Sequence, residues 1–151
     1  MDTSMREQQS QFTATLDNLE PIGAFISKFM KSSSLLEEQI YNFEVSVDEH
    51  ISNLIEHGFK NDSGHKITII CRDDDSKAQI IIADASAGFD PRNYSIPNVE
   101  EKAIYEVPPG GFGNYFICEL MDEVEYVHKP HVRNELILTM YKATKENHSE
   151  S

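Results

Sequence analysis

Apolar side chains recur at helical spacing in two neighbouring segments of the first half of the chain. In residues 17–30 they return every three or four positions, which is the period of one helix face. Residues 34–58 begin with Ser34 and Glu37 at capping-box spacing and end at Gly58, a typical C-terminal cap. The periodic positions are Leu19, Ile22, Phe25, Ile26 and Phe29, then Ile40, Phe43, Val47, Ile51 and Leu54. Two amphipathic helices are therefore predicted.

The other apolar runs are short and favour strands. The predicted strands are residues 11–16, 65–72, 77–84, 123–128 and 135–142, with a short helix over residues 115–121. The acidic run Asp73–Asp75 marks the turn of one antiparallel hairpin, and residues 129–134 mark the turn of a second. This order of elements predicts an α+β fold, a two-layer α/β sandwich whose helices cover one face of a mixed, mainly antiparallel sheet.

Composition indicates one folded domain with polar ends. Hydrophobic residues make up 39% of the 151 positions, enough for a core without covalent cross-links. Residues 1–9 and 143–151 are polar and aperiodic, so we expect disordered tails around a domain spanning residues 10–142. Cys71 and Cys118 lie in apolar runs and are expected to be buried thiols. No signal-peptide pattern and no apolar run of membrane-spanning length is present, so a cytoplasmic location is expected.

Charge narrows the choice of partner. The chain carries 26 acidic and 13 basic side chains, a formal net charge of −13. Such a surface repels nucleic acids and anionic membranes, so neither is an expected partner. A phosphate ligand would need local contacts from backbone N–H groups, a helix N-terminus or a divalent cation. Gly110, Gly111 and Gly113 precede the predicted helix at residue 115 and fit either such a contact or a plain turn.

Two further patterns suggest chemistry. Glu49 and Asn53 are four residues apart on the second predicted helix and lie nearly opposite its apolar stripe. Two interpretations are open: the pair belongs to a solvated polar face, or it forms a catalytic base beside a metal-ligating amide. Asp84 ends an almost continuous apolar strand, where a carboxylate is costly without a donor. It fits a turn cap or an acceptor for a ligand amine, with Gly88 allowing close backbone approach. The aperiodic residues 85–109 indicate a functional loop or lid.

Three strings, taken in order, carry a resemblance to a known family. They are "VDEHISNLIEHGF", "DASAGFDP" and "PPGGFGNYFICELMDEVEY", which together resemble the Bergerat-fold ATPases, the superfamily of gyrase, heat-shock chaperones and histidine kinases. Within that superfamily the chain is similar to the small bacterial anti-sigma factor serine/threonine kinases. The resemblance covers roughly residues 10–142, and its most specific part is the glycine run that leads into "LMDEVEY".

The resemblance implies an ATP- and Mg²⁺-dependent serine kinase that binds a sigma factor and phosphorylates an anti-sigma-factor antagonist. Related proteins often dimerise, so a homodimer is one expected assembly. The implied roles are a catalytic base at Glu49, a Mg²⁺ ligand at Asn53, the adenine acceptor at Asp84, support of the adenine pocket at Gly88, and phosphate contacts at Gly110, Gly111 and Gly113. The alternative is a non-catalytic module in which ATP or ADP gates partner binding.

The sequence departs from the family pattern at two places, and one further motif stays outside it. Ser86 replaces a common glycine in the adenine loop, and prolines, Pro108 among them, stand where some members carry an arginine. These departures favour nucleotide binding over fast phosphoryl transfer. His128 and His131 have a spacing that fits a metal site, but no partner cluster accompanies them, so a surface turn is predicted.

Overall fold

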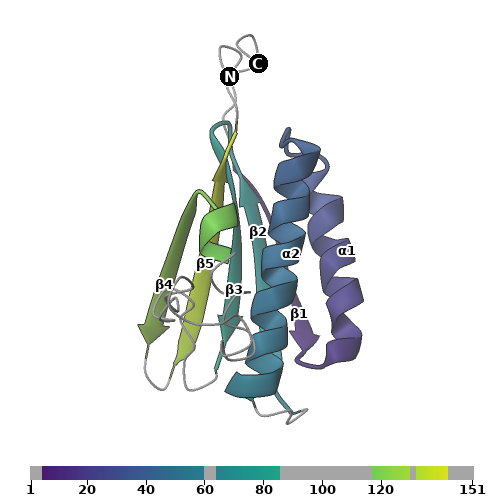
Figure 1. The fold of residues 1–151 in the computed structure, drawn as a ribbon, viewed down its shortest axis with the longest axis vertical. Helices are drawn as coiled ribbons and strands as arrows, with labels where there is room; N and C mark the ends of the chain where they lie inside the picture. Colours follow the sequence, from purple (N-terminus) through teal and green to yellow (C-terminus); the bar gives the residue numbers. More distant parts are fainter. Residues whose placement is uncertain (1–4, 60–63, 86–116, 130–131, 143–151) are drawn as a thin grey trace, which may run out of the picture.

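The computed structural model describes residues 5–59, 64–85, 117–129 and 132–142. They form a five-stranded sheet of order β1-β2-β3-β5-β4 with two long helices side by side on one face (Figure 1). The strands are β1 (Arg6–Thr13), β2 (Lys66–Asp73), β3 (Lys77–Asp84), β4 (Glu123–Lys129) and β5 (Arg133–Tyr141); the helices are α1 (Leu19–Met30) and α2 (Glu37–Asn53). All neighbouring pairs of described strands are antiparallel. The predicted α+β sandwich is confirmed.

The core lies between the helices and the middle of the sheet. It is built mainly from aliphatic side chains, many of them isoleucines, with phenylalanines at three positions, and it includes most of the positions that the apolar periods predicted. Its most deeply buried members include Ile22 and Ile26 of α1, Phe43 and Ile51 of α2, Ile67 and Ile69 of β2, and Ile80 and Ile82 of β3. Burying one such side chain contributes about 1.5–3 kcal/mol, so this layer holds both helices against the sheet.

The N-terminal boundary of the predicted fold is wrong. We expected a disordered tail through residue 9, but β1 begins at Arg6 and pairs with β2 over its whole length. The stretch shows no apolar period because β1 is an edge strand without a fully buried side chain, and its backbone hydrogen bonds to β2 hold it in the sheet.

The start of α2 also differs from the prediction. Ser34 does not cap it: Ser34 has a φ of 68° and lies before the helix, which begins at Glu37. The Gln39 side chain instead accepts a hydrogen bond from the Leu36 backbone N–H at 3.0 Å. The spacing of Ser34 and Glu37 therefore predicted the capping interaction at the wrong position. Glutamine can accept this hydrogen bond as well as glutamate can, and Gln39 does so here.

The far end of α2 brings the candidate residues together. A π-helical turn, Leu54–Gly58, follows the helix directly and is capped by Phe59, one residue after the predicted cap Gly58. In Figure 1 the C-terminal ends of α2, β3 and β4 and the start of β5 all lie at the same end of the sandwich. Residues 117–120 form a further helical turn, in agreement with the predicted third helix.

Candidate functional site

The helix-facing side of the sheet changes from apolar to polar at this end. Residues directly opposite one another in adjacent strands share a face. Across β3, β5 and β4 the successive rows are Ile80–Leu138–Val124, Ile82–Leu136–Tyr126 and Asp84–Asn134–His128. The first two rows belong to the core or pack against it. The third places a carboxylate, an amide and an imidazole where the core ends.

Hydrogen bonds join the members of this polar row. The Asn134 side chain donates from Nδ2 to Asp84 Oδ1 at 3.2 Å, and Asn134 Oδ1 contacts His128 Nδ1. Asp84 is 5% exposed and Asn134 is 1% exposed, whereas His128 is exposed at the edge strand. A buried carboxylate requires such donors, because an uncompensated charge there would cost several kcal/mol. Asp84 was expected to need a hydrogen-bond donor, and the Asn134 side chain is one such donor.

Glu49 and Asn53 form the second half of the candidate site, on α2. Asn53 donates from Nδ2 to Glu49 Oε2 at 3.1 Å, so the two side chains that the helical spacing put on one face do meet. The solvated-face interpretation is wrong for Asn53, which is 3% exposed, while Glu49 is half-buried. Helix periodicity alone misses this burial because it arises from what surrounds the end of α2.

Several residues predicted for the site lie outside the described part of the chain. They are Gly88, Gly110, Gly111 and Gly113, together with most of the predicted loop and the departures at Ser86 and Pro108. Their roles in the adenine pocket and at the phosphates remain predictions. Of the seven predicted site residues, the structure thus describes Glu49, Asn53 and Asp84.

Asn134 and His128 were missed by sequence reasoning. Asn134 was assigned to the turn between the last two strands, and His128 to an unremarkable surface turn. The structure starts β5 at Arg133, which places Asn134 inside the strand, opposite Asp84. The alternation of side chains along a strand is the signal that could have identified them. Asn134 is two residues before Leu136 and His128 is two residues after Tyr126, so each lies on the same face of its strand as a core residue.

Comparison with known proteins assigns the chain to a family. The family described as the histidine kinase-like ATPase domain matches residues 12–142, from the end of β1 past the end of β5. The chain belongs to this family. The resemblance drawn from the three sequence strings is thereby confirmed at the level of the family and its fold.

Curated relatives of this ATPase domain include proteins named serine-protein kinase RsbW. The chain is 29% identical over 94 residues to RsbW of Bacillus cereus (strain ATCC 10987), a match covering 60% of this chain and 58% of the relative. RsbW of Bacillus anthracis is 28% identical over a stretch of the same length. A crystal structure of the RsbU and RsbW domains of Rv1364c from Mycobacterium tuberculosis shares the fold, with a TM-score of 0.62 at 14% identity, covering 89% of this chain and 32% of that one.

Membership of this ATPase family implies the use of ATP, so the described residues can be tested for their fit to Mg²⁺. No group of three or more His, Cys, Asp or Glu side chains in the described ranges is arranged to hold a metal ion. Mg²⁺ that accompanies a nucleotide usually takes one or two protein ligands, with phosphates and waters completing the shell. The Asn53 amide fits that role, because its nitrogen holds Glu49 and an amide oxygen is a hard ligand of the kind Mg²⁺ prefers.

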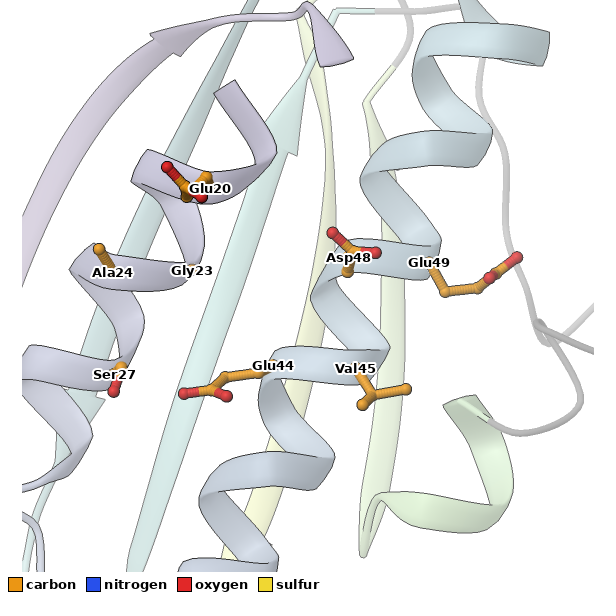
Figure 2. A pocket seen from close by; sticks show the side chains of 8 residues that line it. All are labelled: Glu20, Gly23, Ala24, Ser27, Glu44, Val45, Asp48 and Glu49. Atoms are coloured by element: carbon orange, nitrogen blue, oxygen red, sulfur yellow. The ribbon is translucent and has the colours of Figure 1, made fainter. Parts of the chain in front are cut away.

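A groove between α1 and α2 lies beside Glu49 and is rich in carboxylates. It has a volume of about 520 Å³ and is lined by Glu20 and Gly23 of α1 and by Glu44, Asp48 and Glu49 of α2, among others. Figure 2 shows Glu44 reaching toward α1, while the carboxylate of Glu49 projects from the opposite side of α2. A groove with this many carboxylates repels a polyanion. The groove is therefore an unfavourable place for a polyphosphate.

Cys71 contributes no reactive thiolate to the described part of the site. Burial raises the pKa of the Cys71 thiol to about 12, and the nearby Arg6 guanidinium offsets only part of the rise. Cys71 is therefore protonated at neutral pH and inert. Cys118 is only partly buried, less than expected from its apolar surroundings.

No helix within the described ranges has the length and apolar character needed to cross a membrane.

Proposed function

We propose that this protein is an ATP-dependent serine/threonine protein kinase that acts as an anti-sigma factor and phosphorylates an anti-sigma-factor antagonist. The observation that carries the proposal is the 3.1 Å hydrogen bond between Asn53 and Glu49, at the same end of the sandwich as the buried Asp84. A base, a metal ligand and an adenine acceptor are thus available from α2 and β3. The printed name of the curated relatives, serine-protein kinase RsbW, supports the same activity.

Glu49 would act on the nucleophile. Phosphoryl transfer needs positioning and charge neutralisation more than covalent chemistry. The Glu49 carboxylate accepts the proton of a serine hydroxyl, or orients that hydroxyl in line with the γ-phosphate, and the Asn53 amide keeps the carboxylate in place. Being half-buried, Glu49 is accessible enough to meet a protein substrate.

Asn53 and the glycine run would hold the phosphates. Asn53 would offer its amide oxygen to Mg²⁺, which when bound neutralises part of the phosphate charge. Backbone N–H groups at Gly110, Gly111 and Gly113 would add donors at the start of the following helix. Both contributions matter on a protein with a net charge of −13, which offers little other positive potential.

Asp84 would select the base. Its carboxylate accepts a hydrogen bond from the exocyclic amine of adenine, whereas guanine presents a carbonyl oxygen at the same position and is repelled. Gly88 would support the adenine from the adjoining loop. Partner switching then follows: the domain holds a sigma factor until an unphosphorylated antagonist displaces it, and phosphorylation of the antagonist resets the exchange.

A second candidate is a nucleotide-gated binding module without kinase activity. Two observations favour it, namely Ser86 in place of the family glycine and Pro108 where some members carry an arginine. In this case ATP or ADP would change the affinity for a regulator, but no phosphoryl group would move.

One experiment separates the candidates. The protein is incubated with Mg²⁺, ATP and a recombinant antagonist protein, and the antagonist is examined for phosphoserine by mass spectrometry. The kinase proposal requires stoichiometric phosphoserine. Release of free phosphate without phosphoserine would make the protein a hydrolase, and nucleotide-dependent binding of the antagonist without either product would favour the binding module.

A further inference from the structure

The polar row Asp84–Asn134–His128 has a feature that the proposed kinase mechanism does not use, its outer histidine. His128 lies on the edge strand β4 and is connected to Asp84 through Asn134, which is opposite both residues in the sheet register. The imidazole contacts one end of the Asn134 amide and the Asp84 carboxylate contacts the other. The histidine is thus connected to the adenine acceptor by a single shared side chain.

The chemistry of an amide makes this connection directional. A carboxylate only accepts hydrogen bonds, so Asn134 must turn its nitrogen toward Asp84 and its oxygen toward His128. That oxygen requires a donor, which means that Nδ1 of His128 carries a proton. Rotating the amide by half a turn would set two acceptor oxygens against each other at Asp84. The same rotation would turn the Asn134 nitrogen toward the protonated Nδ1 of His128, so two donors would face each other there. The His128 donor therefore also disfavours the rotated amide.

We infer that His128 is a positioning residue: by fixing the Asn134 amide, it holds the Asp84 carboxylate in the orientation that accepts from an aminopurine. The inference rests on the proposed role of Asp84 in binding ATP. It also accounts for the burial of Asn134, since a 1% exposed amide placed between two polar side chains has no freedom to turn to water.

Neighbouring side chains do not share this connection. Lys129 is the next residue of β4 and is paired in register with Arg133, so it lies on the other face of the sheet. Arg133 forms an ion pair with Glu135 at 2.5 Å. Lys129 is exposed, like His128, and provides a matched control on the same strand.

The first test is a double-mutant cycle read by calorimetry with a non-hydrolysable ATP analogue and Mg²⁺. His128→Ala should weaken binding about 3- to 10-fold, the effect of one ordinary hydrogen bond. Affinity for the matching GTP analogue should not fall. The ratio of the affinities for the ATP and GTP analogues should therefore decrease by the same factor. In the Asn134→Ala background, His128→Ala should have no further effect, because the residue through which it acts is gone. Lys129→Ala should bind like the wild type.

Two results would overturn the inference. In the first, His128→Ala leaves the affinity and the base preference unchanged; in the second, it causes the same loss of affinity in the Asn134→Ala background.

A second measurement, made without nucleotide, keeps this outcome separate from a failure of the proposed kinase function. The Asn134 side-chain amide protons are followed by NMR, and their exchange with solvent should become faster in His128→Ala but not in Lys129→Ala. Unaltered exchange in His128→Ala rejects the positioning role even if the wild type binds no ATP.

Discussion

At the scale of single residues, Asp84 shows how a carboxylate can be kept at the end of a buried strand, where we propose that it recognises a base. Its strand is apolar from Ile80 to Ala83, and the carboxylate at the next position receives a hydrogen bond from its cross-strand neighbour Asn134. An acceptor held in a nearly dry environment discriminates well between ligands, because a ligand without the matching donor leaves the charge uncompensated.

Asp84→Asn should therefore weaken ATP binding. The substitution keeps the size of the side chain but replaces an acceptor that is negatively charged with an amide. A hydrogen bond to a charged group contributes about 1.5–3 kcal/mol, which corresponds to roughly 10- to 150-fold in affinity. Calorimetry with Mg²⁺ and ATP measures the loss, and thermal unfolding shows whether the variant is folded. A folded variant with wild-type affinity would place the adenine elsewhere.

The sequence predicted Asp84 but not its partners, and the reason is physical. A carboxylate after an apolar run is a local signal, whereas the position of Asn134 depends on the pairing of β5 with both β3 and β4. Parity with Leu136 gives Asn134 an inward face only if the strand extends that far, and before the pairing is known an Asn beside Arg133 fits a turn equally well. For the same reason the Glu49–Asn53 contact was predictable from helix geometry, while the burial of Asn53 was not.

At the scale of elements, β1 shows what apolar periodicity cannot detect. The strand has few buried side chains, yet Arg6 anchors its first residue. The Arg6 guanidinium pairs with Asp73 Oδ2 at 2.5 Å, donates to the Phe29 carbonyl at 3.1 Å, and lies 4.1 Å from the centre of the Phe29 ring. One side chain thus links the edge strand, β2 and the end of α1.

Arg6→Ala should lower the free energy of unfolding by about 1.5–3 kcal/mol, because it leaves the nearly buried Asp73 with only Lys142 at 3.9 Å. Chemical denaturation measures the change. Arg72→Ala is a matched control: its ion pair with Glu7 joins the same two strands but both partners are more than a third exposed, so its effect should stay below about 1 kcal/mol. Equal effects of the two substitutions would contradict the anchoring role of Arg6.

At the scale of the whole molecule, charge dictates how a nucleotide can bind. The net charge is −13, and the groove between the helices adds carboxylates beside α2. The triphosphate of ATP therefore approaches a surface that repels it. We therefore expect local donors and a divalent cation to offset that repulsion, and we expect binding to depend on the metal.

Removal of the metal should accordingly abolish ATP binding at low ionic strength. Calorimetry is performed with Mg²⁺ and again with excess chelator, and adenosine serves as the uncharged control ligand. Adenosine should bind equally in both conditions because it carries no phosphate. Undiminished ATP affinity in chelator would show that the protein supplies the positive charge without a metal.

The most direct test of the central claim is single-turnover phosphoryl transfer by Glu49→Gln to an antagonist protein with Mg²⁺ and ATP. Glutamine retains an oxygen that can accept from Asn53 but cannot take a proton from serine, so nucleotide affinity should be nearly unchanged. Transfer should fall about 10²- to 10⁴-fold. Glu44→Gln removes the same charge from the same helix and should transfer like the wild type. If Glu49→Gln forms phosphoserine at the wild-type rate, Glu49 is not the base and the proposed site is wrong.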